Sequence, residues 1–284
     1  MPAALYWRGS HQCTLKPEQN GMTSSERWEK AQEYEQSFWQ SIAEEVAQDS
    51  LGRIDFYSWR AGELRKRFEG LGLAKLTDGS RRIVELGSGP IGVIGYLPGR
   101  DRTALDPLNR FYAANEHLCR LRNPDVRYLD AAGEDIPLDD GAWDLVIMEN
   151  CIDHTQDPGR VMREIHRLLK PGGTLYLTVN GRSRPGYWVH RLLAKLELDP
   201  GHPHTFTKTR FQRFIRENGF EIAWFDAGSW WSAWKHDLLA KSMRARAKGL
   251  LGVSEHLLSC VATKPGGQSF PAGKGGQVPV DGGS

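Results

Sequence analysis

Seven short apolar runs recur along the chain, and each has the length and residue content typical of a buried strand. Stretches with apolar residues at helical spacing separate most of these runs. This alternation predicts an α/β domain in which parallel strands are linked by helices. The predicted strands lie at 82–86, 103–106, 126–129, 143–148, 174–179, 220–225 and 256–263.

Two predicted helices precede the first strand, one beginning at Ser24 and the other spanning about 53–71. Helices in this position are expected to cover the open end of the sheet, as an active-site lid would. Packing of the helices against each other is the alternative, and it is the simpler explanation for each aromatic residue taken singly. The candidate lid residues are Tyr34, Trp39, Trp59 and Arg60. Further helices are predicted at 109–122, 157–169 and 211–219.

The first strand ends in a glycine-rich turn that predicts a ligand site. Gly87 and Gly89 allow the backbone to approach a ligand closely, and a GxGxxG turn of this kind can hold a pyrophosphate. The neighbouring residues argue against an anion. Glu85 would repel a pyrophosphate by several kcal/mol at ~4 Å, and Pro90 has no N–H to donate. We therefore expect a cationic ligand, an ammonium or a sulfonium, at this turn; an ordinary strand–turn–helix connection is the alternative.

The second predicted strand ends in Asp106, 21 residues beyond Glu85. In a βαβ nucleotide fold, an acid at this position accepts hydrogen bonds from both ribose hydroxyls. Asp106, followed by Pro107, is therefore the predicted ribose anchor. An acid at a strand end is also a common turn residue.

Three stretches resemble the class I S-adenosylmethionine-dependent methyltransferases over 82–180. ELGSG at 85–89 is similar to their motif I, GEDIPL at 133–138 is followed by WDLVI at 143–147, and LLKPGGTLYLTV spans 168–179. The resemblance implies a Rossmann-like seven-stranded methyltransferase sheet, mostly parallel with the last strand antiparallel, behind an N-terminal helical cap. It implies S-adenosyl-L-methionine as the cofactor.

The same resemblance implies a set of cofactor-binding residues. Where the family often carries an acid that accepts the adenine amino group, this chain has Ala132, so Asp130, Glu134 or backbone must substitute. The implied cofactor-binding residues are Glu85, Gly87, Ser88, Gly89, Asp106, Pro107, Gly133, Glu134, Glu149 and Asn150.

Two histidines are the candidate catalytic residues. His154 matches a histidine that many members of the family carry after the fourth strand, and it could be a base or could hold the loop. His204 lies with His202 in the loop before a later helix. Because no acid or cysteine stands near this pair in sequence, we expect acceptor-site lining and no metal site.

The domain boundaries follow from composition and pattern. Residues 1–23 show no periodicity and are expected to be disordered, 24–72 form the cap, and 73–263 form the methyltransferase domain. Within that domain, 182–209 is expected to be an acceptor-binding insertion. The Gly-, Pro- and Ser-rich stretch at 264–284 predicts a flexible tail.

The segment 230–248 has two competing interpretations. Trp230, Trp231 and Trp234 precede a stretch with alternating apolar and basic residues, which could lie on an anionic membrane or admit a lipid-linked acceptor. We favour core packing and pocket lining, with at least one tryptophan facing the acceptor, because a single short basic helix binds membranes only marginally.

Composition narrows the function further. A net charge of +2 gives no global signal for nucleic acid, and four widely spaced cysteines in a chain without a signal peptide predict a cytoplasmic protein with reduced thiols. No apolar run reaches the ~18 residues of a membrane span.

The sequence predicts methyl transfer to a small-molecule acceptor, at oxygen; a nitrogen, lipid-linked or glycan acceptor is the alternative. A nicotinamide oxidoreductase and a non-catalytic cofactor-binding protein are remote alternatives, and the oligomeric state is left open.

Overall fold

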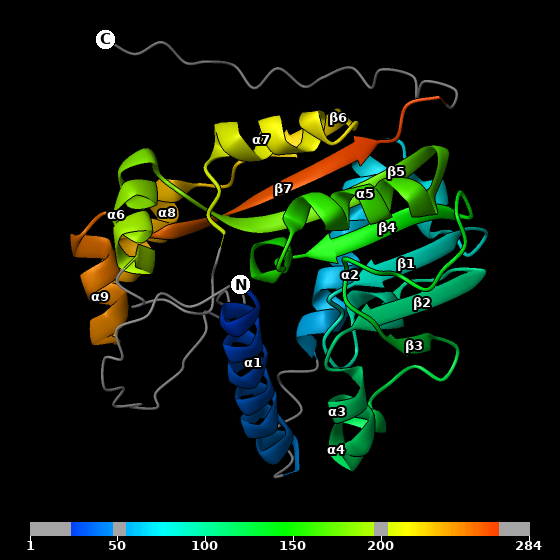
Figure 1. The fold of residues 1–284 in the computed structure, drawn as a ribbon, viewed down its shortest axis with the longest axis horizontal. Helices are drawn as coiled ribbons and strands as arrows, with labels where there is room; N and C mark the ends of the chain where they lie inside the picture. The colour runs from blue at the N-terminus through cyan, green and yellow to red at the C-terminus, as the bar shows by residue number, and fades with distance from the viewer. Residues whose placement is uncertain (1–23, 48–54, 196–203, 267–284) are drawn as a thin grey trace.

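The computed structural model describes residues 24–47, 55–195 and 204–266, and one mixed sheet organises them (Figure 1). The strand order is β3-β2-β1-β4-β5-β7-β6. β7 is antiparallel to both of its neighbours, and the remaining pairs are parallel, as the sequence predicts. The strands are β1 (Arg82–Leu86), β2 (Asp101–Asp106), β3 (Arg127–Asp130), β4 (Trp143–Glu149), β5 (Leu169–Arg182), β6 (Glu221–Asp226) and β7 (Glu255–Thr263).

Helices lie on both faces of this sheet and gather at one of its ends (Figure 1). The α-helices are α1 (Ser24–Ala47), α2 (Asp55–Gly70), α3 (Asn109–Ala114), α4 (Glu116–Cys119), α5 (Pro158–Leu168), α6 (Arg184–Lys195), α7 (Lys208–Glu217), α8 (Trp230–Leu239) and α9 (Met243–Leu250). The 3₁₀ helices are η2 (Ala74–Thr77), η3 (Val93–Tyr96) and η4 (Ile152–His154). None of the described helices is long and apolar enough to cross a membrane.

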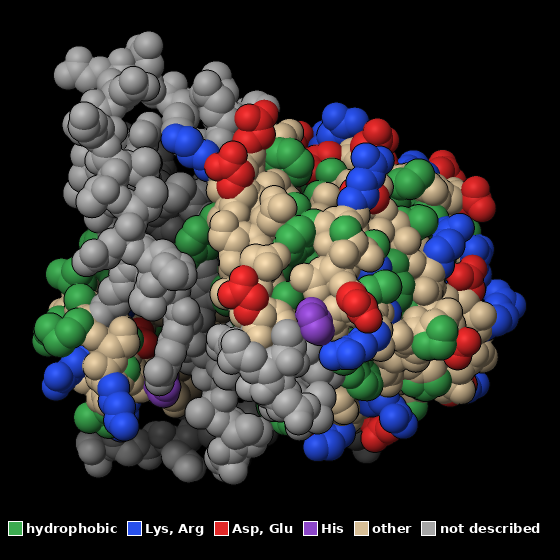
Figure 2. Space-filling model, turned by 90° about the horizontal axis from the view of Figure 1, so that it is seen from below, with side chains coloured by type: hydrophobic (Ala, Val, Ile, Leu, Met, Phe, Trp, Pro, Cys, Tyr) green, Lys and Arg blue, Asp and Glu red, His purple; other side chains and the backbone are tan. Residues whose placement is uncertain are grey.

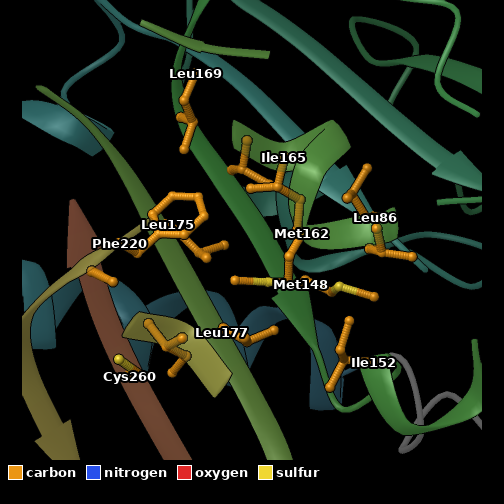
Figure 3. Packing of buried hydrophobic residues seen from close by; sticks show 14 of the residues in the cluster. Leu86, Met148, Ile152, Met162, Ile165, Leu169, Leu175, Leu177, Phe220 and Cys260 are labelled. Atoms are coloured by element: carbon orange, nitrogen blue, oxygen red, sulfur yellow. The ribbon is translucent and has the colours of Figure 1, made fainter. Parts of the chain in front are cut away.

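The larger core lies between α5 and the sheet. Asp157 caps the helix, its Oδ1 accepting a hydrogen bond from Arg160 N at 3.0 Å, and Pro158 occupies the first turn, where no N–H is needed. Met162 and Ile165 then lie beside Leu86 of β1 and other apolar side chains from β4 and β5 (Figure 3). This is the apolar stripe that the spacing of the sequence predicts.

The predicted cap divides into two unequal parts. Ala61, Leu64 and Phe68 of α2 are fully buried with β1 and β4 residues in a second core on the opposite face of the sheet. α2 is thus part of the domain core and does more than cover an open end. α1 stands off the carboxyl ends of the parallel strands (Figure 1) and buries Ala43 against Tyr112 and Leu118.

The structure differs from an ordinary strand–turn–helix connection after the glycine turn, and one helix prediction is wrong in detail. The glycine turn leads into the short 3₁₀ helix η3 and not into an α-helix, because Gly92 at φ 76° redirects the chain and only a short segment separates the turn from β2. The predicted helix at 109–122 breaks at Asn115, which is extended and caps α4 by accepting a hydrogen bond from Leu118 N. The sequence also did not anticipate that the three tryptophans begin α8 itself.

Some sequence predictions fall on residues outside the described ranges. These are the disorder at 1–23, most of the flexible tail at 264–284, and the placement of His202. The boundaries at 72 and at 182–209 stay predictions, although β5 runs to Arg182 and α6 follows it directly.

The α5 core gives the first testable prediction. Ile165→Ala removes a side chain with no exposed surface and should lower the free energy of unfolding by about 2–5 kcal/mol, since the remaining cavity collapses only in part. Arg160→Ala, at an exposed position of the same helix, should change it by less than ~0.5 kcal/mol. Urea unfolding measures both, and equal losses would contradict this assignment of the core.

Candidate active site

The glycine turn follows β1 and is hydrogen-bonded to the carboxyl end of β2. Gly87 and Gly89 have φ values of 66° and 60°, which a side chain would strain. The N–H groups of Gly87 and Ser88 both donate to Leu105 O, at 2.8 and 3.2 Å. A Cβ on Gly87 would lie 2.5 Å from Cys151 Sγ, so glycine is also required sterically. The turn is therefore fixed between β2 and the loop after β4.

Asp106 is held by the same turn. Its Oδ2 accepts a hydrogen bond from Gly89 N at 2.8 Å, and its Oδ1 accepts one from Leu108 N at 2.9 Å. Burial raises the pKa of Asp106 to about 6, although both backbone N–H groups oppose that shift. Pro107 follows it, half-buried. The predicted ribose anchor thus lies at the carboxyl edge of the sheet, directly beside the glycine turn.

Glu85 lies beneath the turn and is 3% exposed. Its two oxygens accept hydrogen bonds from Val93 N at 3.2 Å and Ile94 N at 2.8 Å, the first N–H groups of η3. Burial raises its pKa to about 8, with further increases from Glu149 and Asp106, against the effect of the two N–H bonds. Glu85 therefore braces the glycine turn internally. Direct contact with a cationic ligand, which the sequence suggests, stays a prediction.

Arg60 of α2 reaches the end of β4 and pairs with Glu149. Its Nε donates to Glu149 Oε2 at 3.0 Å, and its Nη2 lies 2.8 Å from Oε1. The side chains are 17% and 12% exposed, so this two-pronged ion pair is largely shielded from water. Arg60 is thus one of the candidate lid residues that the structure brings to a predicted site residue.

Two aromatic residues of the cap lie against the glycine turn. A Cβ built on Gly89 would lie 3.0 Å from the Tyr57 hydroxyl oxygen and 3.2 Å from the Trp39 ring. Burial, together with the charges of Glu85 and Asp106, raises the pKa of Tyr57 well above its ordinary value. Tyr57 was not among the residues predicted for the site. The available signal was a hydroxyl-bearing aromatic on a helix face that is otherwise apolar.

The residues implied to border adenine are engaged with the protein itself. Gly133 packs on α5, where a Cβ would lie 3.2 Å from Val161. Glu134 Oε1 accepts hydrogen bonds from the N–H groups of Gln156 and Asp157, at 2.8 and 3.2 Å, and so holds the loop before α5. Asp130 forms an ion pair with Arg110. None of these contacts tests which group binds adenine.

The loop after β4 contains two buried polar atoms without a hydrogen-bond partner in the structure. Asn150 has a positive φ of 53°, and its side-chain Oδ1 is one of them. The other is Oδ1 of Asp153, a residue that is 2% exposed. A buried acceptor of this kind costs free energy unless a ligand or water supplies a donor. Both residues are therefore candidates to contact a ligand.

The structure brings the two predicted catalytic histidines to the same loop. His204 N donates to Asp153 O at 3.3 Å, and His204 Nε2 lies 2.9 Å from Thr155 O. Since a carbonyl oxygen only accepts, Nε2 carries the proton and Nδ1 is the ring nitrogen left to accept one. His154 Nε2 lies 3.9 Å from Asp153 Oδ1. Nothing in the sequence indicated that His154 and His204, which are far apart along the chain, lie at the same loop.

The arrangement fits a cationic ligand. Three carboxylates, those of Glu85, Asp106 and Glu149, lie at the carboxyl ends of adjacent strands, where α/β sheets bind ligands. Asp106 and Glu149 each raise the pKa of Glu85. A ligand that carries positive charge would relieve this repulsion, and Asn150 Oδ1 offers a further acceptor for its N–H or O–H groups.

The raised pKa of Glu85 gives the second prediction. Folded protein keeps a proton that the unfolded chain releases between pH 4.5 and 8, so stability falls as pH rises through that window. The raised pKa of Asp106 adds to this fall in stability only up to about pH 6. The free energy of unfolding, measured in urea between pH 6.5 and 8, should therefore fall more steeply in the wild type than in Glu85→Gln. Glu116→Gln, at an exposed glutamate, should track the wild type; parallel curves for all three proteins would contradict the shift.

Comparison with known proteins places the central part of the chain. Residues 84–177 match the family described as a methyltransferase domain. The sarcosine/dimethylglycine N-methyltransferase of Halorhodospira halochloris is 28% identical over 51% of this chain and 53% of its own length. A human thiol S-methyltransferase is 30% identical over 53% of this chain and 64% of its own length. The chain thus spans about half the length of the curated relatives it matches, or somewhat more.

A solved structure is similar in fold. A putative sarcosine dimethylglycine methyltransferase from Galdieria sulphuraria aligns with a TM-score of 0.50 at 15% identity, covering 75% of this chain and 86% of that one. The matched residues 84–177 contain the glycine turn, Asp106 and the loop after β4. Over these residues the chain is similar to the methyltransferase domain family.

Proposed function

We propose that this protein transfers the methyl group of S-adenosylmethionine to a small-molecule acceptor, with oxygen as the receiving atom. The observation that carries the proposal is Asp106, a buried carboxylate hydrogen-bonded to the glycine turn at the edge where this family binds its cofactor. Methyl transfer from a sulfonium is an in-line displacement in which positive charge disappears. A dry and pre-aligned pocket therefore supplies most of the rate.

The residues of the site suit the parts of this cofactor. Asp106, with Pro107, would bind the ribose hydroxyls, and the turn braced by Glu85 would hold the methionine end. The acids would favour the sulfonium of the cofactor over the neutral thioether of the product, whose ammonium is unchanged. Tyr57 and Trp39, which cover Gly89, would exclude water from the methyl group. The complete proposed cofactor set is Glu85, Gly87, Ser88, Gly89, Asp106, Pro107, Gly133, Glu134, Glu149 and Asn150.

His154 and His204 support an oxygen acceptor. A hydroxyl must lose its proton as it attacks, and a neutral imidazole at the mouth of the site would take it. His204 has Nδ1 available for this purpose, because Nε2 donates to Thr155 O. Metal ligation is not part of the proposal.

An amine acceptor is the second candidate, and one specific observation favours it. Asp153 is buried, and its Oδ1 has no hydrogen-bond partner in the structure, so the N–H of an unprotonated amine would satisfy it and leave the nitrogen lone pair for the methyl group. The relatives differ in the same respect, since one is named for a nitrogen acceptor and another for a thiol. Nucleic acid is not proposed as a partner, and the cytoplasm is the proposed compartment on the basis of cysteine usage.

Cofactor binding tests the proposal directly. Asp106→Ala should weaken S-adenosylmethionine binding ten-fold or more, because each charge-assisted hydrogen bond lost is worth about 1.5–3 kcal/mol. Glu85→Gln should weaken binding to a similar extent by loosening the turn. Asp101→Ala, at the opposite end of β2, should bind normally. Calorimetry measures all three variants, with NADH as the competing ligand. Tight NADH binding, or unchanged affinity in both site variants, would refute the cofactor assignment.

Turnover to S-adenosylhomocysteine across acceptor classes tests the acceptor atom. With a hydroxyl acceptor, a histidine that takes the proton should contribute to the wild-type rate at saturating cofactor. His154→Ala or His204→Ala should lower that rate at least ten-fold, and His117→Ala, on α4 away from the loop, should not. If both site variants keep full activity and only amines are methylated, the amine assignment replaces the oxygen one.

A further inference from the structure

Helices α8 and α9 expose large apolar side chains to a degree unusual for this molecule. Single exposed apolar residues are common on protein surfaces and need no explanation. Here they gather on one pair of contacting helices and on the residue that follows them. The exposed fractions are 65% for Trp231, 84% for Leu239, 77% for Met243, 79% for Leu250 and 64% for Leu251.

The exposed residues follow helical spacing. On α8, Trp231, Lys235 and Leu239 lie four residues apart and are all exposed, whereas Ala233 and Asp237 are buried. Along one face, successive turns of the helix therefore carry an apolar, a basic and an apolar side chain.

α9 repeats this composition. Met243 and Leu250, seven residues apart, share a helix face with Arg246 and Ala247, and all four are exposed. Gly249, on the opposite side, is buried. Each helix thus presents a mixed apolar and basic stripe to solvent.

The inner sides of the two helices are firmly packed. Trp234 Nε1 donates to Gly249 O at 3.0 Å, and a Cβ on Gly249 would lie 3.0 Å from Leu238. Trp230 and Trp234 stack with ring centroids 6.1 Å apart. The outward stripes are therefore a property of a built helix pair, and no rearrangement within the pair is needed to expose them.

Every charged residue between 239 and 251 is basic. This segment has the four cations Lys241, Arg244, Arg246 and Lys248 and no acid. The acid nearest in sequence to α9 is Glu255, which pairs with Lys248 and with Arg182. Figure 2 shows blue and green side chains next to each other at the left of the molecule, the side on which α9 lies in Figure 1.

We propose that the outer faces of α8 and α9 form a docking surface for an anionic lipid bilayer. Apolar side chains with basic neighbours are what an interfacial surface requires, since the apolar groups enter the boundary region and the cations attract anionic headgroups. A tryptophan at the edge suits the same interface. The surface includes none of the proposed cofactor-binding residues, and the proposal does not depend on methyl transfer.

A second copy of the chain fits this surface less well. A two-fold interface would place the same basic residues against each other, with no acid between 239 and 251 to neutralise them. Trp231 is 65% exposed, and pocket lining by at least one of Trp230, Trp231 and Trp234 stays a prediction.

Co-sedimentation of the full chain with vesicles tests the proposal. Binding to phosphatidylglycerol-containing vesicles should exceed binding to pure phosphatidylcholine vesicles and should weaken as salt is added. Lys241→Glu with Arg246→Glu should lower partitioning at least ~25-fold, since each cation lost near an anionic surface costs about five-fold. Met243→Ser with Leu250→Ser should lower it about ten-fold without changing the salt dependence. S-adenosylmethionine affinity should be unchanged in all of these variants.

A matched control separates this surface from net charge. Lys75→Glu with Arg100→Glu makes the same change of charge at exposed positions elsewhere and should bind vesicles nearly as the wild type does. Equal loss in both charge pairs, or no binding to anionic vesicles by the wild type, would overturn the proposal. Sedimentation velocity tests the alternative occupant, a second copy of the chain. If the wild type is a dimer that does not bind vesicles, and Met243→Ser with Leu250→Ser dissociates that dimer, the surface mediates self-association.

Discussion

The burial of two carboxylates beneath one glycine turn is the constraint on which the rest of the site depends. Glu85 and Asp106 have lost most of their water, and four backbone N–H groups replace it. The chain can present those donors only if it turns sharply, and this is what the positive φ values of Gly87, Gly89 and Gly92 provide. The short helix η3 follows from the same need, since Glu85 takes up N–H groups at its start that a helix leaves unpaired.

This concentration of negative charge also explains how the cap is attached. Arg60 neutralises Glu149 at the end of β4, and the uncharged hydroxyl of Tyr57 faces the turn. α2 cannot leave readily, because Ala61, Leu64 and Phe68 are part of the core. α1 buries far less among the residues described, so it is the part of the cap whose displacement exposes the least apolar surface.

The sequence was sufficient wherever local pattern decides structure. The seven strands, the α5 stripe and the glycine turn could be predicted because each follows from periodicity or from one strongly constrained motif. It was insufficient where partners are distant along the chain. Two examples depend on how separate elements pack: Arg60 pairs with Glu149, and His204 lies beside Thr155. The break at Asn115 shows a third limit, since a side-chain cap competed successfully with helix propensity.

The roles of the acids illustrate why a motif does not fix a contact. Glu85 and Glu134 were both expected to face the cofactor, yet each carboxylate accepts backbone N–H groups of its own chain. Ligand binding does not require their oxygens to be free, because a buried charge acts on a nearby cation through a medium that screens it weakly. Glu85 can therefore organise the turn, and its ionised form would attract a sulfonium. The raised pKa that its burial imposes means that a cation arriving nearby would also favour loss of its proton, which couples ligand binding to proton release.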